Sequence, residues 1–344
     1  MSKVLDLRSD TVSHPTKEMR EAMAKAEVGD VVLNDDPSVL RLEKMGAELF
    51  GKEACLLTAS GTMSNQMAIF SLTNRCDQII AHKNAHIYNL ERSGLAQISG
   101  VQVRALATAD GKYDMEELKA NIVSDSIQSA PTKVVCMENT FNLNDGKCIP
   151  KSHIDEVAEL AHSNGVSVFM DGARILNAAL AMNIAPKDLV ENCDAVALCL
   201  TKGLACPIGS LLCGSRKFIE KARFVRQMLG GGWRQGGIIA AAGIVALEDY
   251  QRLEEDHKAA KYLKQELAKI EPRLAFNSVE TNILAIDLEA IGMTAKELEE
   301  NLAKEAVLVK PIGTHRVRMI CHIDIGREDL NTVIKAWDKV LHKK

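Results

Sequence analysis

The stretch DAVALCLTKGLACPIG, residues 194–209, is an apolar run that ends in a single lysine and a loop of glycine and proline. The run from Asp194 to Leu200 predicts a buried strand, because a short apolar segment bounded by turn residues is typical of one. Lys202 then lies at the mouth of this strand, where partial desolvation disfavours an ammonium group and leaves more free amine. Most lysines at strand ends are simply solvated, so a second feature must decide between the two interpretations.

A second apolar run supplies that feature. Residues 166–170 read as another strand and lead into Asp171-Gly172-Ala173-Arg174. A desolvated amine forms a Schiff base with an aldehyde, and the main biological aldehyde of this kind is pyridoxal phosphate. An aspartate beside the pyridinium nitrogen is the usual electronic partner of that cofactor. Two parallel strands would therefore bring Asp171 and Lys202 to one crevice that holds pyridoxal phosphate.

Apolar runs alternate with amphipathic helical patterns over most of the chain. Further strands are predicted at 78–82, 101–106, 133–138 and 210–213, with helices such as 114–121 and 153–163 between them. This alternation is typical of an α/β protein with a mainly parallel sheet, whose ligands lie beyond the carboxyl ends of the strands.

The C-terminal quarter follows a different pattern. A helical stretch from Gly237 to about Ile270 leads to an α+β unit with strands at 282–287 and 316–322 and helices at 294–303 and 328–341. We expect residues 1–250 to form an N-terminal segment plus a large cofactor domain, and residues 251–344 to form a small C-terminal domain.

Composition excludes several classes of protein. The 344 residues are 47% hydrophobic and 26% charged, which is ordinary for a soluble globular chain. A net charge of -4 without a basic block makes nucleic acid an unexpected partner. No signal peptide is recognisable, and no apolar run reaches the roughly 20 residues that a membrane span requires. The nine cysteines are scattered without metal-ligand spacing, so we expect no metal site and a reduced, cytoplasmic protein.

A phosphorylated cofactor needs a phosphate site, and the segment after the apolar run 55–58 offers one. Ser60-Gly61-Thr62 precedes a helix predicted over 63–73. Free amides at a helix N-terminus, next to glycine and hydroxyl groups, bind phosphate readily. Serine and threonine are common at helix starts, so this segment would mean little without a phosphorylated ligand nearby.

Three further side chains are candidates for the site. The ring of His86 would fit over the outer face of the cofactor, although a lone loop histidine more often faces solvent. Arg234 follows the glycines 230–232 and could clamp a phosphate bidentately, including one in a neighbouring subunit. Arg318 lies on a predicted strand and could bind a substrate carboxylate, although an arginine there is usually an edge charge.

In order and spacing, these residues resemble the threonine aldolases of the aromatic amino acid β-eliminating lyase group. These are fold-type I pyridoxal-phosphate enzymes with the α/β architecture of aspartate aminotransferase. The resemblance covers nearly the whole chain. Its marks are the segments 6–12, 35–37, 60–65, 138–140, 171–174, 201–203 and 231–235, and Arg318 with His322.

The resemblance assigns a role to each candidate. Lys202 forms the Schiff base, Asp171 pairs with the pyridine nitrogen and His86 stacks on the ring. Ser60, Gly61, Thr62 and Arg234 hold the phosphate, while Ser9, Arg174 and Arg318 hold the substrate carboxylate. Arg174 would also lie close to the phenolate oxygen of the cofactor. We expect a homo-oligomer, a dimer or a tetramer, with active sites shared between subunits.

Three positions depart from the family pattern. Leu33, followed by Asn34, stands where the family usually has Tyr-Gly, and Phe141 stands where it usually has histidine. Arg92-Ser93 replaces a usual Ala-Gly. Leu33 and Phe141 would make the substrate pocket more apolar and favour a bulky β-substituent. Arg92, if it pointed inward, would favour an anionic one instead.

The expected reaction is cleavage of the Cα–Cβ bond of a β-hydroxy-α-amino acid, threonine, allo-threonine or a bulkier analogue, to glycine and an aldehyde. Without the family's second histidine, the base would be His86 or a water molecule. β-Elimination or racemisation on the same cofactor remains an alternative. A binding module without catalysis is a third hypothesis, and Lys202 together with Asp171 argues against it.

Overall fold

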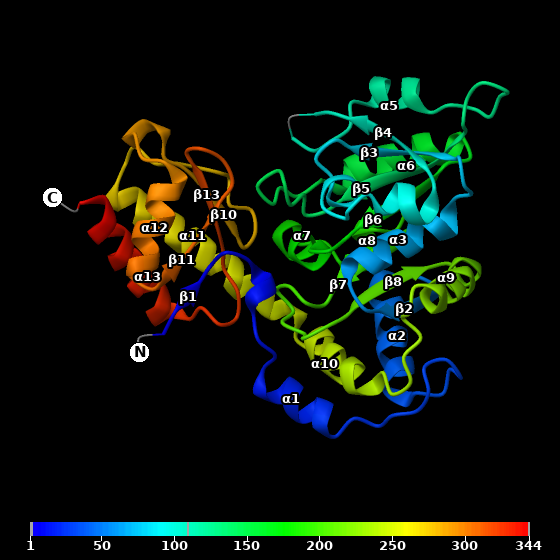
Figure 1. Cartoon of the computed structure of the whole chain (residues 1–344), viewed down its shortest axis with the longest axis horizontal. Coiled ribbons are helices and arrows are strands. Elements are labelled where there is room, and N and C mark those ends of the chain that lie inside the picture. The colour runs from blue at the N-terminus through cyan, green and yellow to red at the C-terminus, as the bar shows by residue number, and fades with distance from the viewer. Residues whose placement is uncertain (1–2, 109, 343–344) are drawn as a thin grey trace.

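The structure, a computed structural model, describes residues 3–108 and 110–342. Among these residues, seven strands form the central sheet of the large domain in the order β2-β8-β7-β6-β5-β3-β4 (Figure 1). Their bounds are β2 Ala54–Thr58, β3 Gln78–His82, β4 Gln102–Leu106, β5 Thr132–Glu138, β6 Ser167–Asp171, β7 Ala195–Cys199 and β8 Ser210–Gly214.

The direction of these strands agrees with the predicted sheet, with one exception. The neighbours β4, β3, β5, β6 and β7 run parallel, whereas β8 is antiparallel to both β7 and β2. The mainly parallel α/β fold is therefore confirmed, and the strand predicted at 210–213 runs against the others. Parallel strands buried on both faces need apolar residues at every position, which explains the continuous apolar runs of the sequence.

Helices cover both faces of the sheet. Along β3, Ile79 packs in the apolar layer of α3 (Gly61–Leu72) and α9 (Arg216–Met228), and Ile80 packs in the layer on the other face. Successive strand residues point to opposite faces, so one strand serves both layers. The second layer includes helices α2 Pro37–Phe50, α6 Lys151–Ser163, α7 Ile175–Met182 and α10 Gly237–Glu248. The remaining helices of this domain are α1 Lys17–Ala24, α4 His86–Asn89, α5 Met115–Asn121 and α8 Pro186–Leu189.

The small domain has its own core around the fully buried Trp337. Its antiparallel sheet has the order β12-β13-β10-β9, with bounds β9 Ala275–Phe276, β10 Ile283–Asp287, β12 Lys310–Pro311 and β13 Arg316–Ile320. Three helices pack with it: α11 Leu253–Ile270, α12 Ala295–Lys304 and α13 Arg327–Leu341. The N-terminal β1 (Leu5–Asp6) pairs in parallel with β11 (Val307–Leu308) of this domain. The start of the chain thus lies with the small domain, and the proposed division at residue 250 stays a proposal.

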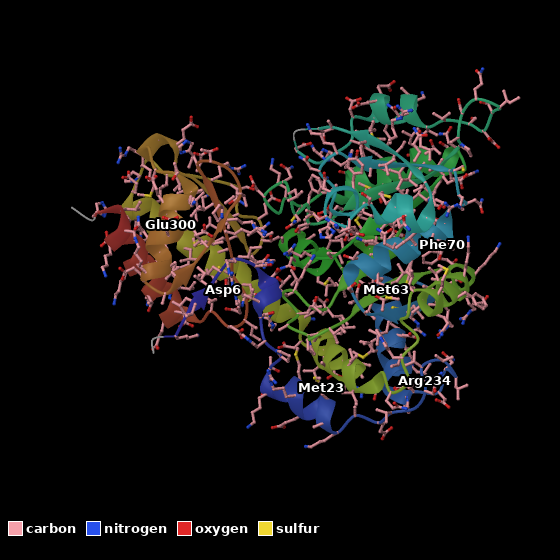
Figure 2. The ribbon with its side chains drawn as sticks, in the orientation of Figure 1. Asp6, Met23, Met63, Phe70, Arg234 and Glu300 are labelled. Atoms are coloured by element: carbon pink, nitrogen blue, oxygen red, sulfur yellow. The ribbon has the colours of Figure 1, made fainter. Side chains whose placement is uncertain are left out.

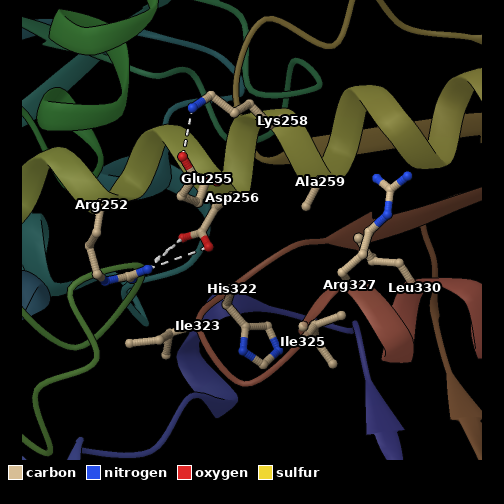
Figure 3. A pocket seen from close by; sticks show the side chains of 11 residues that line it. Arg252, Glu255, Asp256, Lys258, Ala259, His322, Ile323, Ile325, Arg327 and Leu330 are labelled. Carbon is tan, nitrogen blue, oxygen red and sulfur yellow. Dashed lines mark hydrogen bonds and ion pairs between the residues drawn. The ribbon is translucent and has the colours of Figure 1, made fainter.

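The helical stretch predicted from Gly237 to Ile270 is divided in two. The helix α10 ends at Glu248, and a short turn over Tyr250–Arg252 separates it from α11. Figure 3 shows Arg252 beside Asp256, one turn further along α11, and the two side chains form an ion pair at 3.4 Å. Arg252 also donates a hydrogen bond to the carbonyl of Gly203. The first turn of α11 is thereby fastened to the loop that carries Lys202.

In the described residues no helix has the length and apolar character that crossing a membrane requires.

Candidate active site

The predicted lysine and aspartate meet at one edge of the sheet. Asp171 is the last residue of β6, and Lys202 follows the end of the neighbouring parallel strand β7. Directly after Asp171 a glycine is required, because a Cβ at Gly172 would lie 2.5 Å from the carbonyl oxygen of Ala197 on β7. A cavity of about 190 Å³ lies at this edge. It is lined by Ser60, Gly61, Thr62, Asn65, His86, Glu138, Thr140, Asn142, Asp171, Ala173, Arg174, Cys199, Thr201 and Lys202.

The cavity is closed at one end by the N-terminus of α3. Ser60 caps the helix and accepts a hydrogen bond from the amide of Met63 at 3.1 Å. The first amides of a helix have no partner inside it, and they carry the positive end of the helix dipole. The nearest atoms to a Cβ at Gly61 would be those of Cys199, at 3.9 Å, so an anion can approach this backbone closely. Ser60, Gly61 and Thr62 line the cavity at this helix N-terminus, and their binding of a phosphate stays a prediction.

Asp171 is buried and fixed by two donors. The side-chain amide of Asn65 donates to one oxygen at 2.8 Å, and the backbone amide of Ala173 donates to the other at 3.2 Å. The carboxylate keeps unused lone pairs, so it can still accept a hydrogen bond from a protonated ring nitrogen.

His86 is held by a second buried acid. Its Nδ1 lies 2.8 Å from Glu91, which also accepts hydrogen bonds from the amides of Asn65 and Gln66. The hydrogen bond that His86 makes to the carboxylate of Glu91 raises the pKa of His86. The ring is therefore fixed at one nitrogen while its flank faces the cavity, as a stacking role requires.

His86, Glu91 and Asp171 place their ligand atoms within 4.8 Å of one another, close enough to hold a metal ion. The amide of Asn65 donates to both carboxylates, so a hydrogen-bond donor already bridges the two acids. Glu91 is further bonded to His86. The arrangement therefore fits a hydrogen-bonded network better than a cation site.

Two arginines converge on Asn142, one of the residues that line the cavity. Nη1 of Arg174 and Nη1 of Arg318 both point at Oδ1 of Asn142, at 3.4 Å and 3.1 Å. Nε of Arg318 is buried and lacks a hydrogen-bond partner among the described residues. Burial and the charge of Arg174 lower the pKa of Arg318 to about 10. Two guanidiniums with a free donor have the chemistry to bind a carboxylate, and this role stays a prediction.

The N-terminal segment packs against one of these arginines through Asp10. Asp10 is fully buried and pairs with Arg174. Ser9, predicted to contact the substrate, uses its hydroxyl to accept a hydrogen bond from the amide of Thr11 at 3.2 Å. Ser9 does not line the cavity but adjoins Asp10. The hydroxyl of Ser13 donates to the carbonyl of Lys202 at 3.1 Å, so the same segment also supports the lysine loop.

Arg234 and Leu33 lie elsewhere in the chain. The guanidinium of Arg234 is 61% exposed and pairs with Asp30 at 3.0 Å, and Leu33 is 71% exposed on the same surface. Figure 2 shows Arg234 at the edge of the large domain, away from Asp6. The structure therefore does not bring these two residues to the cavity of their own chain.

Phe141 also points away from the cavity. Its ring is 2% exposed and packs edge-on against His82, with 4.8 Å between the ring centres. Its neighbours Thr140 and Asn142 line the cavity instead. The expected apolar contact between Phe141 and a substrate is therefore missing, because the aromatic ring is buried in the core. Arg92 is exposed, which removes support for an anionic pocket.

Several residues of the site have no role predicted from the sequence. Asp10, Asn65 and Glu138 stand inside the segments that carried the resemblance, but no role was inferred for them. Asn142 directly follows Phe141. Glu138 ends the apolar strand β5, a position that could have indicated it, whereas Asn65 lies within the helix α3 and has no such signal.

A family model described as β-eliminating lyase matches residues 6–290. The chain belongs to the β-eliminating lyase family. Its curated relatives include the probable low-specificity L-threonine aldolase 2 of Arabidopsis thaliana, 41% identical over 99% of this chain and 98% of that protein. The low specificity L-threonine aldolase of Escherichia coli K12 is 38% identical over 97% of this chain and 98% of its own length.

Solved structures agree with the fold of this lyase. Leishmania major threonine aldolase superposes with a TM-score of 0.84, at 18% identity, over 98% of this chain and 99% of its own. SPT with PLP as an internal aldimine gives a TM-score of 0.76 at 16% identity, over 98% of this chain and 87% of its own. The fold-type I architecture is confirmed. The family assignment confirms the resemblance and the expected pyridoxal-phosphate-dependent lyase.

Proposed function

We propose that this lyase cleaves the Cα–Cβ bond of threonine, allo-threonine or a bulkier β-hydroxy-α-amino acid, and releases glycine and an aldehyde. One observation carries the proposal. A single cavity is lined by an amine, Lys202, by a buried carboxylate, Asp171, and by Arg174 of the carboxylate clamp. The aldolase names of relatives at about 40% identity support the same reaction.

The residues of the cavity fit pyridoxal phosphate. Lys202 Nζ would hold the aldehyde carbon, Asp171 the ring nitrogen, and the N-terminus of α3 the phosphate. His86 would cover one face of the ring. When bound, the cofactor supplies a conjugated ring that accepts the electron pair of the broken bond.

Arg174 and Arg318 position the substrate. Together they bind its carboxylate, and Asn142 ties the two guanidiniums to each other. Fixing the carboxylate selects which bond at Cα stands perpendicular to the ring, and only that bond is broken efficiently. Asp171 would keep the proton on the ring nitrogen, and Nζ of Lys202 would return a proton to Cα as glycine forms.

We further propose that the protein is a dimer or a tetramer whose sites are shared. Arg234 and Leu33 lie on a surface with other exposed apolar side chains, which we call the apolar face: Val32, Leu33, Phe224, Met228 and Ile238. The loops of this face are joined by the bond from the amide of Val31 to the carbonyl of Arg234, at 2.9 Å. Large exposed apolar patches are typical of subunit contacts. Across such a contact, Arg234 would reach the phosphate and Leu33 the substrate of the neighbouring subunit.

We also propose a cytoplasmic location. The structure describes all nine cysteines, and every one is a free thiol. Free thiols in this number are typical of a reducing compartment.

β-Elimination of an amino acid is the second candidate reaction, and the description of the family as β-eliminating lyases favours keeping it. Both reactions need Lys202 and Asp171 but break different bonds. Racemisation would need the same two residues.

Product analysis tests the proposal. The purified protein, loaded with pyridoxal phosphate, is incubated with a set of β-hydroxy amino acids. Glycine with an aldehyde is the expected result. An oxo acid with ammonia, or an inverted amino acid, would reject aldol cleavage in favour of one alternative. The variant Lys202→Ala serves as the control, and it should lose both turnover and the visible absorption band of the Schiff base.

A further inference from the structure

A buried acid of the cavity still lacks a role. Glu138 is the last residue of β5, directly opposite Asp171 in the register of β5 and β6. Its side chain lines the cavity although the residue is only 8% exposed. Structural carboxylates of this kind usually pair with a cation, whereas both oxygens of Glu138 are bonded to backbone amides.

One of those two amides is that of the stacking residue His86, and the other is that of Asn142, which contacts the two arginines. Oε2 of Glu138 accepts from the amide of His86 at 2.7 Å, and Oε1 accepts from the amide of Asn142 at 2.9 Å. A carboxylate oxygen has two lone pairs, so each oxygen keeps one for another donor. The acid is thereby held rigidly between the stacking histidine and the residue that joins the carboxylate clamp.

The short distance between the carboxylate and the β-hydroxyl of the substrate indicates where that hydroxyl lies. The side chain of Asn142 contacts both arginines that bind the substrate carboxylate. In a β-hydroxy amino acid, the hydroxyl oxygen is separated from the carboxyl carbon by only Cα and Cβ. A substrate held by the clamp must therefore place its hydroxyl within a few ångströms of the clamp. Glu138 lines the cavity next to the clamp, because it is bonded to the amide of Asn142.

The other acids and bases of the cavity already have a proposed role or a partner. Asp171 is assigned to the ring nitrogen and His86 to the face of the ring, while Cys199 is bonded to Thr201. Phe141, at the position of the family's second histidine, points away. Glu138 remains as a rigid carboxylate with free lone pairs.

The charges around Glu138 suit proton exchange near neutral pH. Burial, together with the charge of Asp171 on β6, raises the pKa of Glu138 to about 7, while the amides of His86 and Asn142 and the charge of His86 oppose the rise. Arg174 and Lys202 also line this cavity. A group with a pKa near the working pH can both take and release a proton.

We propose that Glu138 is the general base that takes the proton of the substrate's β-hydroxyl. This inference rests on the proposed aldol cleavage. As the O–H proton passes to Glu138, the C–O bond becomes a carbonyl, the Cα–Cβ bond breaks, and its electron pair stays on Cα. Cα then takes up one proton to become glycine. The proton lost by the hydroxyl balances the one gained at Cα, so no other reactant is needed.

The variant Glu138→Gln keeps the shape of the side chain and removes the base. With threonine, we expect kcat to fall by about 10²–10⁴-fold, the usual contribution of general base catalysis, with KM changed less than about threefold. The acid limb near pH 7 in the kcat/KM profile should disappear. Glu138→Asp should recover part of the activity.

Hydrogen exchange at Cα of glycine separates this role from a structural one. Glycine has no β-hydroxyl, so NMR in D₂O should show that Glu138→Gln exchanges its α-proton at nearly the wild-type rate. The matched control is Glu280→Gln, because Glu280 also accepts a backbone amide, that of Cys148 at 2.8 Å, but lies outside the cavity. This control should retain full threonine cleavage.

A measurement without the cofactor is also available. Infrared difference spectra of the apoprotein should contain a carboxyl band that titrates near pH 7 and is missing in Glu138→Gln. Normal threonine cleavage by Glu138→Gln, or an equal loss of cleavage and glycine exchange, would overturn the assignment while leaving the aldolase proposal intact. A wild-type protein that releases no glycine from any β-hydroxy amino acid would instead overturn the proposed function and this role with it.

Discussion

Asp10 accepts two parallel hydrogen bonds from Arg174, one from Nε at 2.8 Å and one from Nη2 at 2.6 Å. The two residues are 164 positions apart in the chain, and both are buried. Burial alone would raise the pKa of Asp10, but the charge and hydrogen bonds of Arg174 hold it well below its ordinary value. The N-terminal segment therefore sets the orientation of an arginine that lines the cavity and for which we propose substrate binding.

Replacing Asp10 with asparagine should damage both stability and binding. Breaking a buried ion pair leaves an uncompensated charge and costs about 3–5 kcal/mol. We expect that loss in urea unfolding, together with a raised KM for threonine. The control is Arg41→Gln, which breaks an exposed pair with Glu248 and should cost no more than about 1 kcal/mol. An unchanged KM in Asp10→Asn would mean that Arg174 is oriented without Asp10.

Sequence patterns predicted those parts of the site that lie at the ends of regular elements. Asp171 and Lys202 follow apolar runs, and Gly61 starts a helix, so their places depend on local signals. The pair of Asp10 with Arg174 depends on a long-range approach that no local pattern contains. The resemblance predicts the ring of Phe141 in the pocket, because the family usually has a histidine there, but core packing decides on which side of the backbone the ring lies.

The fold shows the same division between local and long-range information. Apolar runs located the strands of the sheet but could not give the direction of β8, since a buried strand looks the same either way. The break between α10 and α11 was missed because the helical pattern continues through Tyr250–Arg252. At the break, Arg252 donates a hydrogen bond to the carbonyl of Gly203, a long-range contact that no local pattern contains.

Asp256 should make folding stability depend on pH. Burial raises the pKa of Asp256 from the 3.8 of the free side chain to about 7. Between these two values the unfolded chain has ionised while the folded protein still holds the proton. The contribution of Asp256 to the free energy of unfolding is therefore fully present below about pH 4, and it is lost as the pH rises to about 7.

The variant Asp256→Asn removes this titration. Its midpoint of urea unfolding should change less between about pH 5 and about pH 8 than that of the wild type. Glu254→Gln is the matched control, since Glu254 is exposed on the same helix and should leave the pH dependence as it was. Equal slopes for Asp256→Asn and wild type would show that other groups cause the pH dependence.

Asp171→Asn should separate cofactor binding from turnover. Asparagine can still occupy the place beside Asn65 and Ala173, so pyridoxal phosphate should remain bound, as judged by its absorption and by borohydride trapping at Lys202. Turnover should fall at least about 100-fold, equivalent to about 2.7 kcal/mol in the barrier, because the ring nitrogen loses its anionic partner. Near-normal turnover would reject this role for Asp171.

Mixing two inactive variants tests the shared site. If Arg234 acts on the neighbouring subunit, a hybrid of Arg234→Ala and Lys202→Ala contains one intact site. Random pairing of equal amounts should then restore about a quarter of the wild-type activity. A mixture of Lys202→Ala with Asp171→Asn should stay inactive, because these residues share one cavity within each chain. Light scattering that finds an active monomer would contradict the arrangement outright.

Phe141→His tests where substrate preference is decided. Because the ring of Phe141 is buried against His82, a histidine there should lower stability by about 1–3 kcal/mol through an unsatisfied polar group. The ratio of kcat/KM for threonine to that for phenylserine should stay within about threefold of wild type, since the side chain does not line the cavity.

The preference for a bulky β-substituent then depends on Leu33. Burying apolar surface contributes about 25 cal/mol per Å², so contact with an aryl group can offset a lost hydrogen bond of about 1 kcal/mol. We expect wild type to favour phenylserine over threonine, and Leu33→Tyr to reduce that preference. Leu33 is exposed in its own chain, so this effect requires the subunit contact that the hybrid experiment detects. A tenfold gain for threonine in Phe141→His, with no change in Leu33→Tyr, would place the decision at Phe141 and reject the role of Leu33.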